Sequence, residues 1–191
     1  MNTKPIQEFI IQSEENLRIA EAVAETLPNA RHKMTEEFLA RLDKRIKEGL
    51  PGWKSGRDSV FFTDRYPTYY FWKPEWIGQY GVALQFGEYG KEMVFGLYRE
   101  KEKVGNRPFS EKLMTAIKEV YSRAGTNPWW EARIPMESPA ENWRKPEVMW
   151  RMHKDDSFLD DVADQLLELA KISEQIVDQL VRQYKKSDNL Q

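Results

Sequence analysis

The sequence predicts an α+β protein with a central antiparallel sheet of four to six strands, a covering helix, an N-terminal helical hairpin and a long C-terminal helix. Of the 24 aromatic residues, 14 lie between Trp53 and Tyr98, and aromatic side chains favour strands. In this region apolar residues recur with a period of two, whereas on either side the period is about 3.6. The connections between the expected strands are too short for the crossover that a parallel pair requires, so antiparallel neighbours are expected.

The first 52 residues are expected to form two helices. Apolar residues from position 5 to position 27 follow one helical face, and Pro28 would end this run. A second helix should begin at Thr35, an N-cap candidate, and stop near Gly49. The two helices would pack on each other as a hairpin.

The middle of the chain should contain the sheet. In the third expected strand Val82, Leu84 and Phe86 alternate with small or polar residues, which predicts one apolar face and one mixed face. Strands are expected at residues 60–63, 68–72, 80–86 and 92–98, with two further short strands at 130–134 and 148–152.

A covering helix is expected over residues 110–124, with Ser110 as its N-cap and Gly125 as its terminator. The last helix should begin at Asp156 or Ser157 and run to about residue 186, a length of roughly 45 Å. Its apolar residues keep a heptad-like spacing, so the helix needs a helical partner, either the N-terminal helices or the same helix of a second copy. These interface candidates are Val162, Leu166, Leu169, Ile176 and Leu180.

Three segments follow from this organisation: a helical segment at 1–52, the aromatic-rich sheet with its covering helix at 53–152, and the long helix at 153–191. We expect them to share one compact domain. The net charge of -2 gives no reason to expect general attraction to nucleic acid or to anionic lipid. No apolar run is long enough for a membrane span or a secretory signal, which predicts a cytoplasmic protein without a membrane partner.

The residue types required for most catalytic chemistry are scarce. The chain has no cysteine and only two histidines, His32 and His153, which belong to no metal-binding motif. Phosphate-binding loops and serine-nucleophile motifs are absent as well. The sequence therefore predicts no cofactor and favours a protein without catalytic activity.

Clustered acidic residues at the start of the last helix are one candidate site. Asp156, Asp160 and Asp164 recur every four residues and so share one helical surface. Such a row could hold Mg²⁺ in a metal-dependent nuclease or other phosphoesterase. The alternative is that these carboxylates favour the positive end of the helix dipole and keep the outer face solvated.

The aromatic sheet is the second candidate. Tyr70, Trp72, Gln85 and Tyr98 are expected to form an accessible patch on one sheet face. Such residues can stack the bases of a single-stranded nucleic acid. The same residue types also fill protein cores and subunit interfaces.

The order of elements resembles the C-terminal part of certain proteins of the PD-(D/E)XK nuclease superfamily. The likeness rests on the aromatic pair of strands at 60–72, the glycine-interrupted pair at 82–98, and a helix that ends at Gly125. Trp129-Trp130, Asn142-Trp143 and Trp150 then precede a long terminal helix. In that family the preceding domain holds the metal-binding carboxylates and the lysine that activate water. No such motif occurs in this chain, so the resemblance implies an accessory module without the cutting module.

These observations favour a non-catalytic binding or protein-interaction module, accessory to defence or nuclease systems as the resemblance implies. A protein partner or self-association is expected. The two alternatives are a metal-dependent nuclease that uses the aspartate row and a single-strand nucleic-acid binder that uses the aromatic sheet face.

Overall fold

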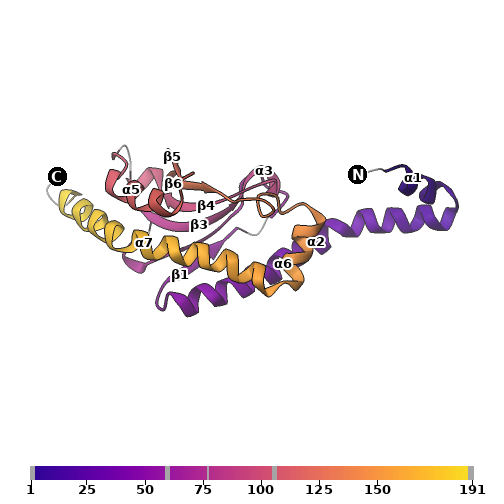
Figure 1. Ribbon diagram of the computed structural model, residues 1–191, viewed down its shortest axis with the longest axis horizontal. Coiled ribbons are helices and arrows are strands. Elements are labelled where there is room, and N and C mark those ends of the chain that lie inside the picture. The colour runs from indigo at the N-terminus through magenta and orange to yellow at the C-terminus, as the bar shows by residue number, and fades with distance from the viewer. Residues whose placement is uncertain (1–2, 59–60, 77, 105–106, 189–191) are drawn as a thin grey trace.

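The computed structural model describes residues 3–58, 61–76, 78–104 and 107–188, and it confirms the predicted α+β architecture (Figure 1). The sheet has six strands in the order β1-β2-β3-β4-β6-β5, and every neighbouring pair is antiparallel. Its strands are β1 (Lys54–Arg57), β2 (Thr68–Trp72), β3 (Tyr80–Phe86), β4 (Glu92–Arg99), β5 (Gly125–Asn127) and β6 (Trp130–Pro135). The helices are α1 (Lys4–Ile11), α2 (Glu14–Gly49), η1 (Pro74–Trp76), α3 (Gly87–Gly90), α4 (Lys101–Val104), α5 (Glu111–Val120), α6 (Pro146–Lys154) and α7 (Asp156–Asp188).

One face of the sheet is covered by helices and forms the main core. Helix α7 packs along β3 and β4, and it also contacts α2, α5 and α6 (Figure 1). Phe38 of α2, Trp143 and Phe158 of α7 meet with ring centroids 5.1 to 5.8 Å apart. Residues from all three predicted segments contribute to this single cluster. Burial of such large apolar side chains is the main favourable contribution to folding.

The period-2 pattern located most of the strands correctly. β2 and β3 have the predicted bounds, β4 is one residue longer than predicted, and the strand predicted at 130–134 is β6. The strand predicted at 60–63 is wrong, because Phe61, Phe62 and Thr63 form a turn with a positive φ at Phe62, while Val60 lies outside the described residues. β1 at Lys54–Arg57 takes its place on β2, in a polar stretch that lacks the aromatic pattern.

The predicted pair of N-terminal helices is present, but the break between them lies elsewhere. Helix α2 begins after Ser13, whose hydroxyl accepts a hydrogen bond from the backbone N–H of Asn16 at 3.1 Å. It then continues through Pro28, which was predicted to end a helix. Proline removes one hydrogen-bond donor, but the surrounding turns are exposed, so water can reach the carbonyl that loses its partner. Thr35, the predicted N-cap, is a buried residue inside this helix, and its hydroxyl donates to the carbonyl of Arg31.

Two predictions near the end of the sheet region are wrong. The segment 148–152, in which four of the five residues are apolar, was predicted as a strand, but it belongs to α6. Pro146 occupies the first helical turn, and the side chain of Trp150 is exposed instead of sharing a strand face with its neighbours. The covering helix α5 keeps its predicted Ser110 N-cap but ends at Val120, so Gly125 opens β5 instead of terminating the helix.

Helix α7 finds its partners within the chain. Val162, Leu166 and Leu169 are buried against the core, as their spacing predicts. Ile176 and Leu180 lie at the margin of the contact and are only partly buried. The buried stripe follows the 3.6-residue period of a straight helix and not the heptad spacing, and it continues through Ser173, Val177 and Val181.

No helix within the described residues is both long and apolar enough to cross a membrane.

Candidate functional site

The face of the sheet opposite α7 carries the candidate site. In the observed register Tyr70 pairs with Ala83, Gly81 pairs with Tyr98, and Tyr98 pairs with Trp130. Side chains at paired positions, and at every second position of a strand, project to the same face of a sheet. Small residues of β3 and β4 separate the aromatic side chains of this surface, which are Tyr70, Trp72, Tyr98 and Trp130.

Small residues let the rings lie close to the backbone. Ala83 and Val94 form a second, smaller core with Trp130, and Tyr98 packs against it. At Gly96 an added Cβ would lie 2.0 Å from the carbonyl oxygen of Ala132 and 2.9 Å from the Trp130 ring, so only glycine fits. The rings thus form a layer directly over the strands.

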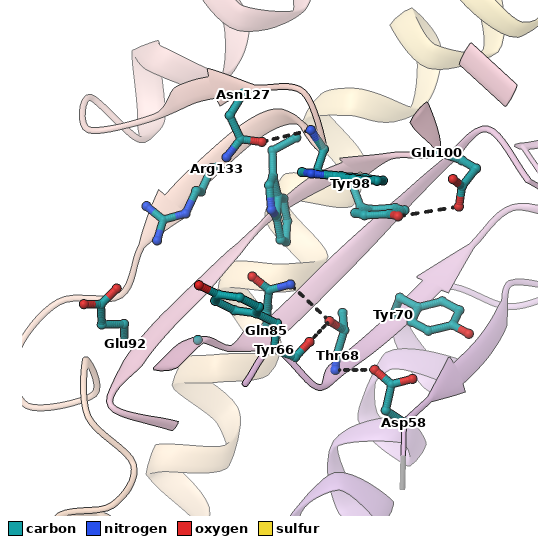
Figure 2. A pocket seen from close by; sticks show the side chains of 13 residues that line it. Asp58, Tyr66, Thr68, Tyr70, Gln85, Glu92, Tyr98, Glu100, Asn127 and Arg133 are labelled. Carbon is teal, nitrogen blue, oxygen red and sulfur yellow. Dashed lines mark hydrogen bonds between the residues drawn. The ribbon is translucent and has the colours of Figure 1, made fainter. Parts of the chain in front are cut away.

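Above this layer lies a hollow of about 980 Å³, which we call the aromatic hollow (Figure 2). Tyr70 stacks on Trp72 at one side, with ring centroids 5.4 Å apart, and Tyr98 meets the edge of Trp130 at the other. Trp129 at its rim is half exposed. The residues that line it are Asp58, Tyr66, Thr68, Tyr70, Gln85, Gly87, Glu92, Tyr98, Glu100, Asn127, Trp129, Trp130 and Arg133.

Hydrogen bonds fix several of the polar groups of the hollow. The backbone N–H of Thr68 donates to Asp58 Oδ2 at 2.8 Å, and Gln85 Nε2 donates to the Thr68 hydroxyl at 3.3 Å (Figure 2). The Tyr98 hydroxyl points toward Glu100 Oε2, at 3.5 Å. Burial, followed by the nearby Glu100 carboxylate, raises the pKa of Tyr98 to about 12, so this phenol stays protonated near neutral pH.

The charges of the lining are uneven. Asp58, Glu92 and Glu100 contribute carboxylates, while Arg133 contributes the cation. Within the part of the chain that the structure describes, neither Glu92 nor Arg133 forms an ion pair. Figure 2 shows these two at one end of the hollow, and Asp58, Tyr70 and Glu100 toward the other.

The sequence pointed to part of this surface. Tyr70, Gln85 and Tyr98 line the hollow, and Trp72 lies beside it under Tyr70. Sequence reasoning missed the residues that loops, the first position of β4 and β6 supply, because their place beside the rings depends on how the strands pair and the loops turn. Trp130, at the start of the strand predicted at 130–134, was the one sequence feature that indicated a contribution from β6. The missed residues include Asp58, Glu92, Glu100, Trp129, Trp130 and Arg133.

The aspartate row of α7 has a different role in the structure. Arg41 Nη1 lies 3.1 Å from Asp156 Oδ1, and Arg45 Nη2 lies 2.9 Å from Asp160 Oδ1. The two arginines are four residues apart on α2, and the two aspartates are four residues apart on α7, so the spacing of the acidic row matches that of the arginines. Asp164 is exposed further along the helix. Among the described residues, no three acidic, histidine or cysteine side chains form a group that could hold a metal ion.

Comparisons of the chain with protein-family models, with curated proteins and with solved structures find no match.

Proposed function

We propose that this protein is a non-catalytic protein-interaction module that holds an extended segment of a partner in the aromatic hollow. The single observation that supports this proposal is the lining of the hollow: the exposed rings of Tyr66, Tyr70 and Trp129 at the sheet surface, with amide, hydroxyl and carboxylate groups around them. Rings supply contact area with little loss of side-chain freedom, and the polar groups can pair with the backbone of an extended peptide.

The charges of the hollow favour a protein segment over a nucleic acid. Proteins that bind single strands combine stacking rings with a positively charged groove. Here three carboxylates surround the rings against the guanidinium of Arg133, so phosphate groups would be repelled. The aromatic residues that could stack bases line the hollow or lie beside it, but the carboxylates around them disfavour the phosphate groups of a nucleic acid.

The metal-dependent nuclease is also disfavoured. Asp156 and Asp160 are engaged by Arg41 and Arg45, which neutralise the charge that a cation would need. These ion pairs link α2 to α7, which gives the two aspartates a structural role. The resemblance to the PD-(D/E)XK superfamily stays a prediction, as do the accessory role in defence or nuclease systems and the cytoplasmic location that accompany it.

Selection from a displayed library of random linear peptides tests the proposal. Peptides that bind the full chain should lose at least about tenfold in affinity on Tyr70→Ala and on Trp129→Ala, as expected when an aromatic anchor is removed. Trp150→Ala is the matched control, because Trp150 is an exposed tryptophan on α6 away from the hollow. Equal binding to all variants, or no enrichment of any peptide, would contradict the proposal.

A further inference from the structure

We propose that the partner segment is positively charged, and that it places arginine or lysine side chains between the rings and the carboxylates of the aromatic hollow. This inference rests on the proposed function and names the chemistry of the ligand.

The first support is charge complementarity at one end of the hollow. Asp58 and Glu100 lie toward the end where Tyr70 also lies, whereas Arg133 is at the opposite end (Figure 2). Among the described residues, Asp58 accepts a hydrogen bond from the backbone N–H of Thr68, and Glu100 accepts one from the hydroxyl of Tyr98. A carboxylate has room for several donors, so both can accept further bonds from a guanidinium or an ammonium group.

The rings supply the second support. The face of an aromatic ring attracts a cation, and this attraction adds to that of a nearby carboxylate. Tyr98 reaches Glu100 with its hydroxyl at 3.5 Å, and Tyr70 and Asp58 line the same hollow. Burial is the main cause of the raised pKa of Tyr98, and the Glu100 carboxylate adds to it.

At the border of the hollow, one arginine of the protein itself contacts both a carboxylate and an aromatic ring. The guanidinium of Arg65 donates to Glu88 Oε1 from Nε at 2.9 Å and also from Nη2, and it lies 5.1 Å from the centre of the Tyr66 ring. Tyr66 itself lines the hollow. A partner arginine beside Tyr98 and Glu100 would repeat this ring-and-carboxylate arrangement.

Arg133 carries a charge opposite to that of the carboxylates, so its removal and theirs should change binding in opposite directions. If the guest is basic, removal of a carboxylate weakens binding, and removal of the Arg133 charge strengthens it. An acidic guest, a nucleic acid or an anionic lipid surface would show the opposite signs. The direction of these two effects therefore identifies the class of ligand.

The experiment measures fluorescence anisotropy of a labelled peptide of alternating arginine and glycine, with glutamine and glutamate replacing arginine in two control peptides. The arginine peptide should bind at least about fivefold more tightly than the glutamine peptide, and added salt should weaken it. Glu100→Gln and Asp58→Asn should each weaken binding by about threefold or more, and Arg133→Gln should strengthen it. Glu119→Gln, an exposed change on α5, is the control that should have no effect.

Each contrary result has a distinct meaning. Equal or tighter binding of the glutamine or glutamate peptide, or binding of a labelled oligothymidine that Arg133→Gln abolishes, would overturn the basic guest. If library-selected peptides are neutral but remain sensitive to Trp129→Ala, the proposed function stands and this inference fails. If the arginine peptide binds but ignores both Trp129→Ala and Tyr70→Ala, it binds elsewhere and this inference fails. The proposed function fails only if the library-selected peptides ignore both variants as well.

Discussion

Helix α2 belongs to two regions that differ sharply in burial. Its second half, from Thr35 to Ile46, places five buried side chains in the body, including Phe38 and Leu42. Its first half and α1, residues 4–30, contain no buried residue and project from the body as an arm (Figure 1). Seven large apolar side chains of this arm are exposed: Ile6, Phe9, Ile11, Leu17, Ile19, Val23 and Leu27.

The two halves of α2 show that an amphipathic pattern does not predict whether the apolar face of a helix is buried. The two halves of α2 have similar spacing of apolar residues, but only the second half meets α6 and α7. In the arm, local interactions hold the helices: the Ser13 N-cap, the Glu14–Arg18 ion pair, and the bond from Asn16 Nδ2 to the Phe9 carbonyl at 2.7 Å. Large exposed apolar patches are typical of surfaces that pack against other chains.

The largest expected effect separates the core from the arm. Phe38→Ala should lower the free energy of unfolding by about 3–5 kcal/mol, because it removes a buried ring packed against Trp143 and Phe158. Phe9→Ala, the matched change in the arm, should cost less than about 0.5 kcal/mol. Urea unfolding followed by circular dichroism measures both. Similar costs for the two variants would mean that the arm is part of the cooperative core.

The sequence predicted the fold class and most strands because burial on one sheet face imposes a period of two on β2, β3 and β4. It misplaced the N-terminal break because Pro28 disfavours a helix locally but is tolerated in the exposed arm. It placed a strand at 148–152 because a short run of apolar residues fits a strand as well as a partly buried helix. The site was predictable only in part: Tyr70 and Tyr98 were expected on an accessible face on condition of a strand register that the sequence does not fix. Arg133 joins them only because β6 pairs with β4.

The second prediction concerns Pro28. Pro28→Ala restores a backbone donor inside α2 and should stabilise the arm helix locally by about 3 kcal/mol. Amide hydrogen exchange should slow for residues around position 28 while exchange in the body stays the same. Slower exchange throughout the body would show that the arm and the body unfold together.

The third prediction places self-association on the arm. Val162, Leu166 and Leu169 of α7 are buried within the chain, so the exposed apolar residues of the arm are the surface on which a second copy would pack. Light scattering should give a dimer, and Val23→Glu should raise its dissociation constant at least about tenfold by placing a charge in that contact. Val120→Glu changes an equally exposed valine of α5 and should leave the dimer intact.

A wild-type chain that stays monomeric at high concentration would contradict this prediction. Equal weakening by Val23→Glu and Val120→Glu would instead move the contact away from the arm. In either case the exposed half of α2 would need a different partner.

The smallest effect is expected at the helix N-caps, Asp155 of α7 in the body and Ser13 of α2 in the arm. Asp155 caps α7: its Oδ1 accepts from the backbone N–H groups of Ser157 and Phe158 and from the Ser157 hydroxyl, and Arg151 donates to its Oδ2. Hydrogen bonds from Ser157 and then from Arg151 lower the pKa of Asp155 to about 2. The Ser13 hydroxyl that caps the arm has no ionisation in this range.

Since the folded-state pKa of Asp155 lies below its ordinary value of 3.8, its contribution to stability is complete above about pH 4 and is lost as the pH falls toward 2. Asp155→Asn keeps a capping side chain but cannot titrate. The difference in unfolding free energy between wild type and Asp155→Asn, measured from pH 5 to pH 2, should therefore shrink with acidification. Ser13→Ala should show a difference that does not change with pH. A pH-independent difference for Asp155→Asn would mean that the α7 cap is no more sensitive to charge than the cap of the arm.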